Sequence, residues 1–284
     1  MDPQKKHELE VFAAEIRLET ARSVIERGFG HLPGSLSVVD VLAYLYGGEM
    51  KYDPKNPKWD GRDLLVMSKG HAGPAVYAAL ALKGFFPLEE LLTLNQPGTR
   101  LPSHCDGQLT PGVDMTTGSL GQGVSTAIGL QLANQLAGND RRTFLFVGDG
   151  ESNEGQVWEG AMFSAHHKMH NLCWIYDYNR KQLDGPIEDV MEMGDVAAKF
   201  RAFDFNVVEI DGHDFDQIDD AIRSFNEETE RPTCIVMHTN KGQGVQELIE
   251  MKLNHHIRLA EDQSAEILST LEQQLNEVKE AARV

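Results

Sequence analysis

A glycine-rich turn with a central carboxylate is the part of the sequence best suited to chemistry. Residues 148–155 read GDGESNEG and follow the apolar run TFLFV. Such a turn between a strand and a helix brings backbone N–H groups close to a bound phosphate, and the helix N-terminus adds partial positive charge. Asp149 lies inside the turn, where its carboxylate would repel a phosphate unless a divalent cation lay between them. We therefore interpret Asp149 as a metal ligand.

A second polar residue follows the next apolar run. Asn179 stands in the segment DYNRKQLDG, directly after LCWIY and thirty residues beyond Asp149. Two parallel strands joined by one crossover helix place the loops after both strands at the same edge of the sheet. Asp149 and Asn179 can then supply two oxygen ligands, and a backbone carbonyl, phosphate oxygens and water can complete the octahedron of Mg²⁺. A GDG alone is usually a plain turn, but the order strand, GDG, helix, strand, Asn is far more specific.

Helical and strand-like segments alternate along the chain and would position these loops. Apolar residues recur every three or four positions in six stretches, which predict helices at residues 8–27, 37–46, 75–83, 120–136, 157–169 and 215–226. Short apolar runs predict strands at residues 64–68, 143–147, 172–176, 205–210 and 234–238. Near-continuous apolar strands separated by helices predict an α/β fold with three layers and a mostly parallel central sheet.

Length and composition limit the class of protein. The 284 residues are read as a single domain, 1–284, with a C-terminal amphipathic helix at about 260–284 that packs on the domain or on a partner. The net charge of −18 argues against nucleic-acid binding, because phosphate backbones are bound by clustered Lys and Arg. The three cysteines form no CxxC pair, and no apolar run is long enough to span a membrane. A cytoplasmic location is the expectation.

Several blocks of sequence carry a family resemblance. They are HLPGSLSVVDVLAYLY (31–46), SKGHAGPAVYAAL (68–80), SHCDGQLTPGVDMTTGSLGQG (103–123), GDGESNEGQVWEGAMFSAHH (148–167) and HTNKGQGV (238–245). Together with GDG and the later Asn, they resemble successive segments of the N-terminal, diphosphate-binding domain of thiamine-diphosphate-dependent transketolases. The resemblance covers nearly the whole chain in order, and it implies the thiamin diphosphate-binding fold.

The resemblance implies a role for each matched cofactor residue. Asp149 and Asn179 match the side-chain ligands of the metal, expected to be Mg²⁺ with Ca²⁺ or Mn²⁺ as substitutes, and the backbone carbonyl of Lys181 matches the third ligand. Gly150 would lie against the diphosphate, and Leu183 would cover the thiazolium. The cofactor's ring system would be approached by the turn that contains Gly118, Ser119 and Leu120.

Histidines and one glutamate match positions that act on the substrate. His71 is expected on the cofactor side and His31 and His104 on the sugar side, because proton transfer among hydroxyls needs groups that titrate near neutral pH. Glu154 matches a carboxylate at the subunit interface, although an acidic residue in a first helical turn is also common without such a role. Split transketolases typically carry Trp-His-Gly near the domain's end, where this chain has His255, His256 and Ile257, so His256 keeps the imidazole without its usual neighbours.

The resemblance also implies that a second polypeptide is needed. In transketolases the glutamate that activates the cofactor belongs to a pyrimidine-binding domain, and this sequence contains no counterpart. The expected assembly is a heterotetramer (α₂β₂) with a C-terminal, pyrimidine-binding transketolase subunit. It would transfer a two-carbon ketol unit from a ketose or ketose phosphate to an aldose acceptor. Which sugars these are, and whether they are phosphorylated, stays open.

Two other functions remain as alternatives. The α-type subunit of a thiamine-dependent 2-oxo-acid dehydrogenase shares the metal motif and the split architecture, but the HLPGSLS, SKGHAGP and TTGSLGQG blocks favour transketolase. A noncatalytic subunit that keeps the cofactor fold is the other alternative, and the presence of both Asp149 and Asn179 argues against it.

Overall fold

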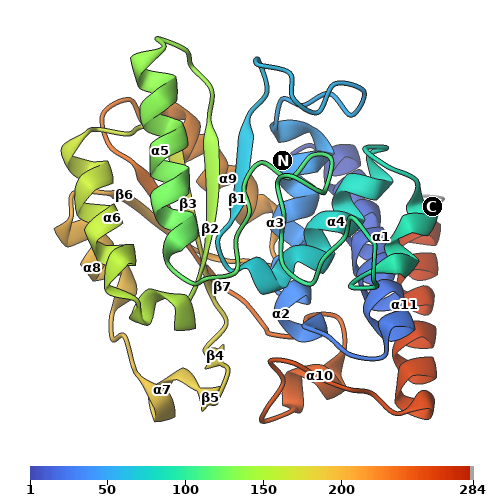
Figure 1. Ribbon diagram of the computed structural model, residues 1–284. Coiled ribbons are helices and arrows are strands. Elements are labelled where there is room, and N and C mark those ends of the chain that lie inside the picture. Colours follow the sequence, from blue (N-terminus) through green and yellow to red (C-terminus); the bar gives the residue numbers. More distant parts are fainter. Residues whose placement is uncertain (282–284) are drawn as a thin grey trace.

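A five-stranded parallel sheet forms the centre of the chain. The computed structural model describes residues 1–281, and its sheet has the order β1-β2-β3-β7-β6 (Figure 1). The strands are β1 (Leu64–Met67), β2 (Thr143–Gly148), β3 (Leu172–Tyr178), β6 (Asn206–Asp211) and β7 (Thr233–His238). A separate antiparallel hairpin pairs β4 (Lys181–Gln182) with β5 (Gly185–Pro186). The predicted α/β class and mostly parallel sheet are confirmed.

Helices cover both faces of this sheet. On one side lie α5 (Gln122–Leu136), α6 (Gly155–His166) and α8 (Val196–Ala202). On the other lie α1 (Pro3–Arg27), α3 (Val39–Tyr44), α4 (Gly73–Leu82), α9 (Phe215–Glu227) and α11 (Glu261–Ala281). Shorter segments are α2 (Leu32–Leu36), α7 (Ile187–Val190) and α10 (Gln246–Glu250). The arrangement is the predicted three-layer α/β/α.

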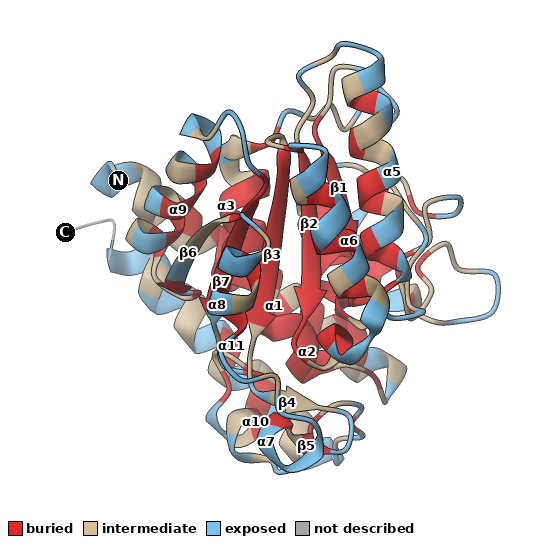
Figure 2. Cartoon of the chain, turned by 90° about the vertical axis from the view of Figure 1, so that its left-hand side faces the viewer, coloured by how far each residue is buried: buried red, intermediate tan, exposed pale blue. Residues whose placement is uncertain are grey.

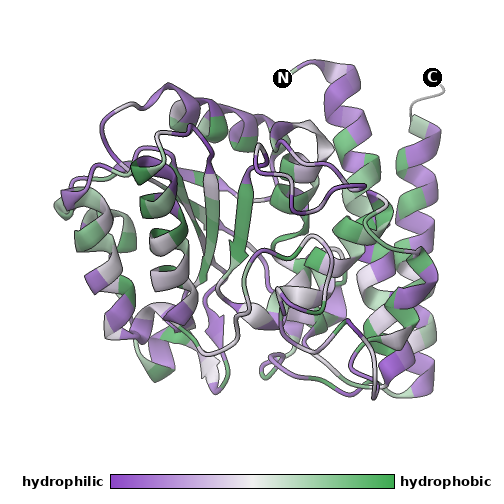
Figure 3. Ribbon diagram, turned by 45° about the horizontal axis from the view of Figure 1, so that its top comes forward, coloured by the Kyte–Doolittle hydropathy of each residue, from purple (hydrophilic) through white to green (hydrophobic). Residues whose placement is uncertain are grey.

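The buried side chains form two hydrophobic cores, one on each face of the sheet, because side chains alternate between the faces along each strand. In β2 every residue is buried, yet Phe144 and Phe146 pack with α1, α3, α4 and α9, whereas Leu145 and Val147 pack with α5, α6 and α8. Successive side chains of a strand point to opposite faces, so a strand covered on both sides must be apolar throughout. β1, β2, β3 and β7 are accordingly buried in Figure 2, whereas most residues of the edge strand β6 are partly exposed. In Figure 3, polar residues collect on the outer faces of the helices.

Several helices and strands begin or end at residues other than those predicted from the sequence. The helix predicted at residues 120–136 begins at Gln122 because Gly121 takes a φ of 81°, in the left-handed region that glycine adopts at low cost. The helix predicted at 37–46 is α3 followed by a π-helical turn, Leu45–Glu49, that ends around Gly48 with a φ of 147°. The strand predicted at 205–210 is shifted by one residue to β6.

The C-terminal helix α11 packs along α1 (Figure 1). Ile267 and Leu271 are buried in the core, and Lys279 reaches Glu15 of α1 at 2.7 Å. The last three residues of the predicted segment at about 260–284 lie outside the described residues. That the chain is one domain over 1–284 stays a prediction. Across residues 1–281, the helices lack the combination of length and apolar character that crossing a membrane requires.

Candidate functional site

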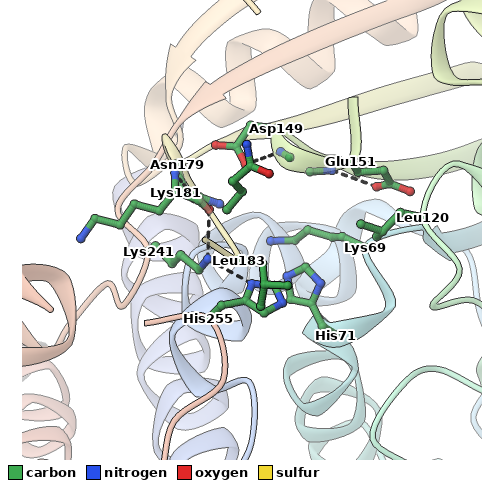
Figure 4. A pocket seen from close by; sticks show the side chains of 13 residues that line it. Lys69, His71, Leu120, Asp149, Glu151, Asn179, Lys181, Leu183, Lys241 and His255 are labelled. Carbon is green, nitrogen blue, oxygen red and sulfur yellow. Dashed lines mark hydrogen bonds between the residues drawn. The ribbon is translucent and has the colours of Figure 1, made fainter. Parts of the chain in front are cut away.

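A cleft opens where the carboxyl ends of β2 and β3 meet. Gly148 pairs with Asp177 across the two strands, so the loops that follow both strands start side by side. The cleft holds about 540 Å³ of space between atoms, part of which is open to solvent. It is lined by Lys69, His71, Leu120, Gly148, Asp149, Gly150, Glu151, Asn179, Lys181, Gln182, Leu183, Lys241 and His255 (Figure 4). Segments far apart in the sequence therefore converge at the predicted edge.

Asp149 carries a buried oxygen that has no partner. Its side chain is 2% exposed, and Oδ1 accepts a hydrogen bond of 2.7 Å from the backbone N–H of Gly150. Oδ2 is buried and has no hydrogen-bond partner within residues 1–281. Burial, with the negative charge of nearby Asp177, raises the pKa of Asp149 to about 7. The hydrogen bond from Gly150 and the charges of Lys241 and Lys69 oppose this rise only in part, and a cation at Oδ2 would supply the remaining counter-charge.

Asn179 and Lys181 stand beside Asp149 at the start of the next loop (Figure 4). Asn179 Nδ2 donates to Asp177 at 2.8 Å, while its Oδ1 accepts from the backbone N–H of Lys181 at 3.1 Å. The side chain of Lys181 points away from the cleft and donates to the carbonyl oxygens of Ile249 and Met251. Its own carbonyl oxygen faces Lys241, whose Nζ donates to it at 2.9 Å.

Three oxygen atoms of these residues could coordinate a divalent ion that also binds a ligand. They are the carboxylate of Asp149, the amide oxygen of Asn179 and the carbonyl oxygen of Lys181, all of which are hard oxygen ligands. In the described part of the chain no three His, Cys, Asp or Glu side chains are grouped to hold a metal alone. Oxygens of the ligand and water would have to fill the remaining positions, as is usual for Mg²⁺ bound with phosphates. The orphaned Oδ2 of Asp149 is the observation that supports this fit.

Two buried lysines bring positive charge to the cleft. Lys69 is 1% exposed and bonds to Asp177, to the hydroxyl of Ser37 and to the carbonyl oxygen of Gly34. Lys241 is 3% exposed, and burial lowers its pKa to about 8 against the opposing charge of Asp149. The net charge of the chain is −18, so its overall field would repel an anionic ligand. The two lysines that line the cleft supply the positive charge locally.

Asp177 is the buried anion that organises the edge of the sheet. It is fully buried, and this raises its pKa, but the charge and hydrogen bond of Lys69 outweigh burial and hold the pKa below its usual value. Thr239 also donates to it, from the loop after β7. The carboxylate at the end of β3 thus connects to the loop after the adjacent β7 and to the loop after β1, which lies two strands away.

Glu151 joins the GDG turn to the turn that precedes α5. It is 2% exposed, and it accepts hydrogen bonds from the backbone N–H groups of Gly121 at 2.9 Å and Gly148 at 3.0 Å, and from the hydroxyl of Ser68. Burial raises its pKa, which these hydrogen bonds oppose. The two turns expected to hold opposite ends of a ligand are therefore fixed relative to each other.

Close backbone approach explains two glycines. A Cβ on Gly150 would lie 2.7 Å from the Cβ of Gln182, and the β4–β5 hairpin would have to move. Gly118 has a φ of 132°, and a Cβ there would lie 3.1 Å from the ring of His104. Both positions need glycine for the chain to pass so near its neighbours.

The predicted histidines gather beside the cleft. The ring of His31 lies 5.6 Å from that of His71 and 5.3 Å from that of His104, measured between centroids. Burial lowers the pKa of all three, to about 4 for His31, where neighbouring imidazoles and Lys241 add to the effect. His71 lines the cavity, whereas His31 and His104 stand outside its lining. The three rings are therefore neutral near pH 7, and the expectation that His31 and His71 titrate near neutral pH is wrong.

The tandem histidines near the end of the domain are placed differently from each other. His255 lines the cavity, with its ring 4.7 Å from His71 and 5.2 Å from His31. His256 is exposed and outside the lining, with its ring 4.8 Å from His31 and 5.6 Å from Phe29. The predicted residue of the pair is thus the outer one.

The remaining predicted residues lie at the mouth of the cleft or beyond it. Leu120 and Leu183 line the mouth and are 39% and 61% exposed, while Ser119 is exposed and lies outside the lining. Glu154 is exposed, and it makes no side-chain hydrogen bond within residues 1–281 and does not line the cavity. Its predicted role at a subunit interface stays a prediction.

The predicted site residues did not include any of the other charged residues of the cleft, nor its second histidine. Lys69, Lys241, Glu151 and His255 all line the cleft, and the first three are buried. Each stands inside or beside a block that was already noted, next to glycine in the case of Lys69 and Lys241. A charged residue within a glycine-containing turn at a strand end was the available signal.

Comparisons with known proteins agree on one family. The domain described as "Transketolase, thiamine diphosphate binding domain" matches residues 9–277. The chain is 45% identical over 272 residues to the 6-deoxy-6-sulfo-D-fructose transketolase subunit SqwG of Clostridium sp. (strain MSTE9), covering 95% of this chain and 98% of that protein. It is 35% identical to an apulose-4-phosphate transketolase subunit of Phocaeicola vulgatus, covering 87% and 88%.

Solved structures show the same likeness. The transketolase of Campylobacter jejuni superposes with a TM-score of 0.88 at 32% identity, over 97% of this chain and 43% of that enzyme. The transketolase of Leishmania mexicana superposes with a TM-score of 0.83 at 27% identity, over 97% and 45%. The chain therefore spans less than half the length of these enzymes but nearly the full length of the subunits above.

Proposed function

The chain belongs to the transketolase family of thiamine-diphosphate-binding domains, and on that premise we propose that it is the diphosphate-binding subunit of a two-subunit transketolase. Its reaction would move a two-carbon ketol unit from a ketose donor to an aldose acceptor. The observation that carries the proposal is the buried Oδ2 of Asp149, which has no hydrogen-bond partner among residues 1–281 and belongs to a residue that lines the cleft with Asn179 and Lys181. The match to the transketolase domain over residues 9–277 also favours this function over a 2-oxo-acid dehydrogenase.

The proposed cofactor site holds thiamine diphosphate through a divalent ion. Asp149, Asn179 and the carbonyl of Lys181 would bind Mg²⁺, with Ca²⁺ or Mn²⁺ as substitutes, and the ion would bind the diphosphate. Lys69 and Lys241 would add positive charge, and Gly150 would allow the diphosphate to approach the backbone. Leu183 and the turn from Gly118 to Leu120 stand at the mouth, where the cofactor's rings would emerge.

The residues around the cleft suit the handling of hydroxyl protons. Bound thiamine diphosphate supplies the carbon nucleophile that carries the two-carbon unit. His31, His71 and His104 are neutral near pH 7, so each imidazole can both donate and accept a hydrogen bond or take a proton. We propose His31 and His104 as partners of the sugar hydroxyls and His71 as a partner of the cofactor.

A second subunit is proposed to complete the site. The support is that SqwG and the apulose-4-phosphate protein are named as subunits and match this chain over nearly their full length, whereas it spans 43% of the Campylobacter enzyme. Leu120 and Leu183 leave apolar surface open at the cleft mouth, which a pyrimidine-binding subunit would cover. We propose an α₂β₂ heterotetramer in which Glu154 faces that interface. The cytoplasmic location expected from the sequence stays a prediction.

The donor is proposed to be a ketose with an anionic group at its far end. The two relatives compared above are named for a sulfonated ketose and a phosphorylated one. The higher identity to SqwG makes 6-deoxy-6-sulfo-D-fructose the first donor to test. The residues that would read the anionic end are proposed to lie in the partner.

The test is ketol transfer by the purified pair. The chain is produced with its proposed pyrimidine-binding subunit, supplied with thiamine diphosphate and Mg²⁺, and assayed with sulfonated and phosphorylated ketoses and an aldose acceptor. We expect a new ketose two carbons longer than the acceptor, no turnover when either polypeptide is assayed without the other, and none with Asp149→Asn. Decarboxylation of a 2-oxo acid in place of ketose turnover would contradict the proposal.

A further inference from the structure

The loop after α10 turns one of its two adjacent histidines into the cleft. Asn254 is 1% exposed, and its Nδ2 donates to the carbonyl oxygens of Lys241 at 3.2 Å and Leu248 at 2.7 Å. Ile257 is also buried, and its backbone N–H and C=O both bond to Gly30 at 3.0 Å. These two anchors flank the histidine pair, so which ring faces inward is set by fixed backbone on both sides.

The inner histidine, His255, is held by a lysine. Lys241 Nζ lies 3.3 Å from Nδ1 of His255, and the same ammonium donates to the carbonyl of Lys181 (Figure 4). An ammonium has only donors, so Nδ1 must be the accepting nitrogen and the ring proton must be on Nε2. Burial, followed by the charge of Lys241, lowers the pKa of His255 to about 3, which keeps this neutral tautomer.

The Nε2–H of His255 is then a donor with an unused hydrogen bond. Within residues 1–281 it has no hydrogen-bond partner, and the ring lines the cleft between Lys241 and His71. A half-buried donor that lines a cleft and has no partner among the described residues favours an acceptor atom on a ligand.

The outer histidine lacks these features. His256 is exposed, has no hydrogen bond within the described residues, and lies against Phe29, whose ring also faces the guanidinium groups of Arg27 and Arg258. His256 nevertheless is the residue that an ungapped match to the family assigns to the ligand.

We propose that His255, and not His256, is the ligand-binding histidine of this loop, and that it donates its Nε2–H to an oxygen of the ligand in the cleft. The inference rests on the proposed function, because it takes that ligand to be the cofactor's diphosphate or the transferred sugar. Both offer oxygen acceptors. If the acceptor is on the diphosphate, the affinity for thiamine diphosphate depends on His255, and if it is on the sugar, the KM of the ketose does. Lys241 acts here as a positioning residue that fixes the tautomer.

The experiment compares four variants of the assembled pair. His255→Ala, His255→Gln and His256→Ala are measured beside His7→Ala, an exchange on α1 away from the cleft. We expect His255→Ala to weaken binding roughly tenfold, as loss of one hydrogen bond to a desolvated partner does. The loss appears in the dissociation constant of thiamine diphosphate if the oxygen is on the diphosphate, and in the KM of the ketose if it is on the sugar. His255→Gln keeps an N–H donor and should recover part of the loss.

Two of the measurements do not depend on turnover. Should the wild-type pair bind thiamine diphosphate but convert no ketose, the proposed function fails, and the affinities of the same variants for thiamine diphosphate still decide whether His255 binds the diphosphate. Nitrogen NMR of the ¹⁵N-histidine-labelled chain, with His255 assigned by its loss in His255→Gln, reads the tautomer directly. A proton on Nδ1, or a loss in His256→Ala equal to or larger than that in His255→Ala, would overturn the inference.

Discussion

Replacing Lys69 with methionine is expected to destabilise the folded chain by about 3 to 5 kcal/mol, because it leaves a buried carboxylate without its cation. Lys69 is 1% exposed and Asp177 is fully buried, so water cannot compensate either charge. Asp177 keeps its hydrogen bonds from Ser37 at 2.8 Å and Asn179 at 2.8 Å, which places the expectation at the lower end of that range. In a thermal melt the loss corresponds to a Tm decrease on the order of 10 °C for a domain of this size.

A second substitution separates the effect of the unpaired charge on stability from the effect of packing. Lys69→Met/Asp177→Asn removes both charges, and we expect it to recover at least half of the stability that Lys69→Met loses. Arg223→Met provides the control, since the exposed Arg223 pairs with Asp219 and Asp220 on one helix and its loss should lower the urea midpoint far less than the loss of Lys69 does. Urea unfolding is followed in EDTA so that no metal contributes. A single variant as stable as wild type, or a double variant no better than the single one, would refute the reasoning.

Three further predictions concern the turns around the cleft. Gly150→Ala should reduce the affinity for thiamine diphosphate, measured by calorimetry, about tenfold, because the new Cβ would lie 2.7 Å from the Cβ of Gln182. Gly155→Ala is the control, since a Cβ there meets open space. Equal losses of affinity in both variants would contradict the steric explanation. Glu151→Gln should cost about 1 to 3 kcal/mol in urea unfolding, since an amide NH₂ would face a backbone N–H; an unchanged midpoint would count against the turn-joining role. The pKa of His31 is about 4 when folded and near 6.5 when unfolded, so the unfolded state alone takes up a proton between these values. Stability should therefore fall as pH decreases from 6.5 to 4, by less than ~1.4 kcal/mol per pH unit because the ring is partly exposed, and His31→Gln should flatten that slope; an identical slope in the variant would exclude His31 as its source.

The sheet and the meeting of two strand ends could be predicted because they follow from patterns within the sequence. Apolar runs separated by helices leave few arrangements other than a parallel sheet, and that sheet places Asp149 and Asn179 at one edge. The short α2, α7 and α10 escaped prediction because four or five residues carry too little periodicity.

The cations of the cleft could not be predicted in the same way. Lys69 and Lys241 are buried through tertiary contacts with Asp177 and the Lys181 carbonyl, and nothing local in the sequence indicates burial of a lysine. Which of His255 and His256 lines the cleft likewise depends on where Asn254 and Ile257 are anchored. Matching the sequence position by position to the family does not contain that information.

Binding of Mn²⁺ observed by electron paramagnetic resonance tests the central claim most directly. Mn²⁺ replaces Mg²⁺ at such sites and couples magnetically to the phosphorus of a bound diphosphate. With the wild-type pair and thiamine diphosphate, we predict bound Mn²⁺ with phosphorus hyperfine coupling, and with Asp149→Asn only the signal of the hydrated ion. Bound Mn²⁺ with the same phosphorus coupling in Asp149→Asn would contradict the account.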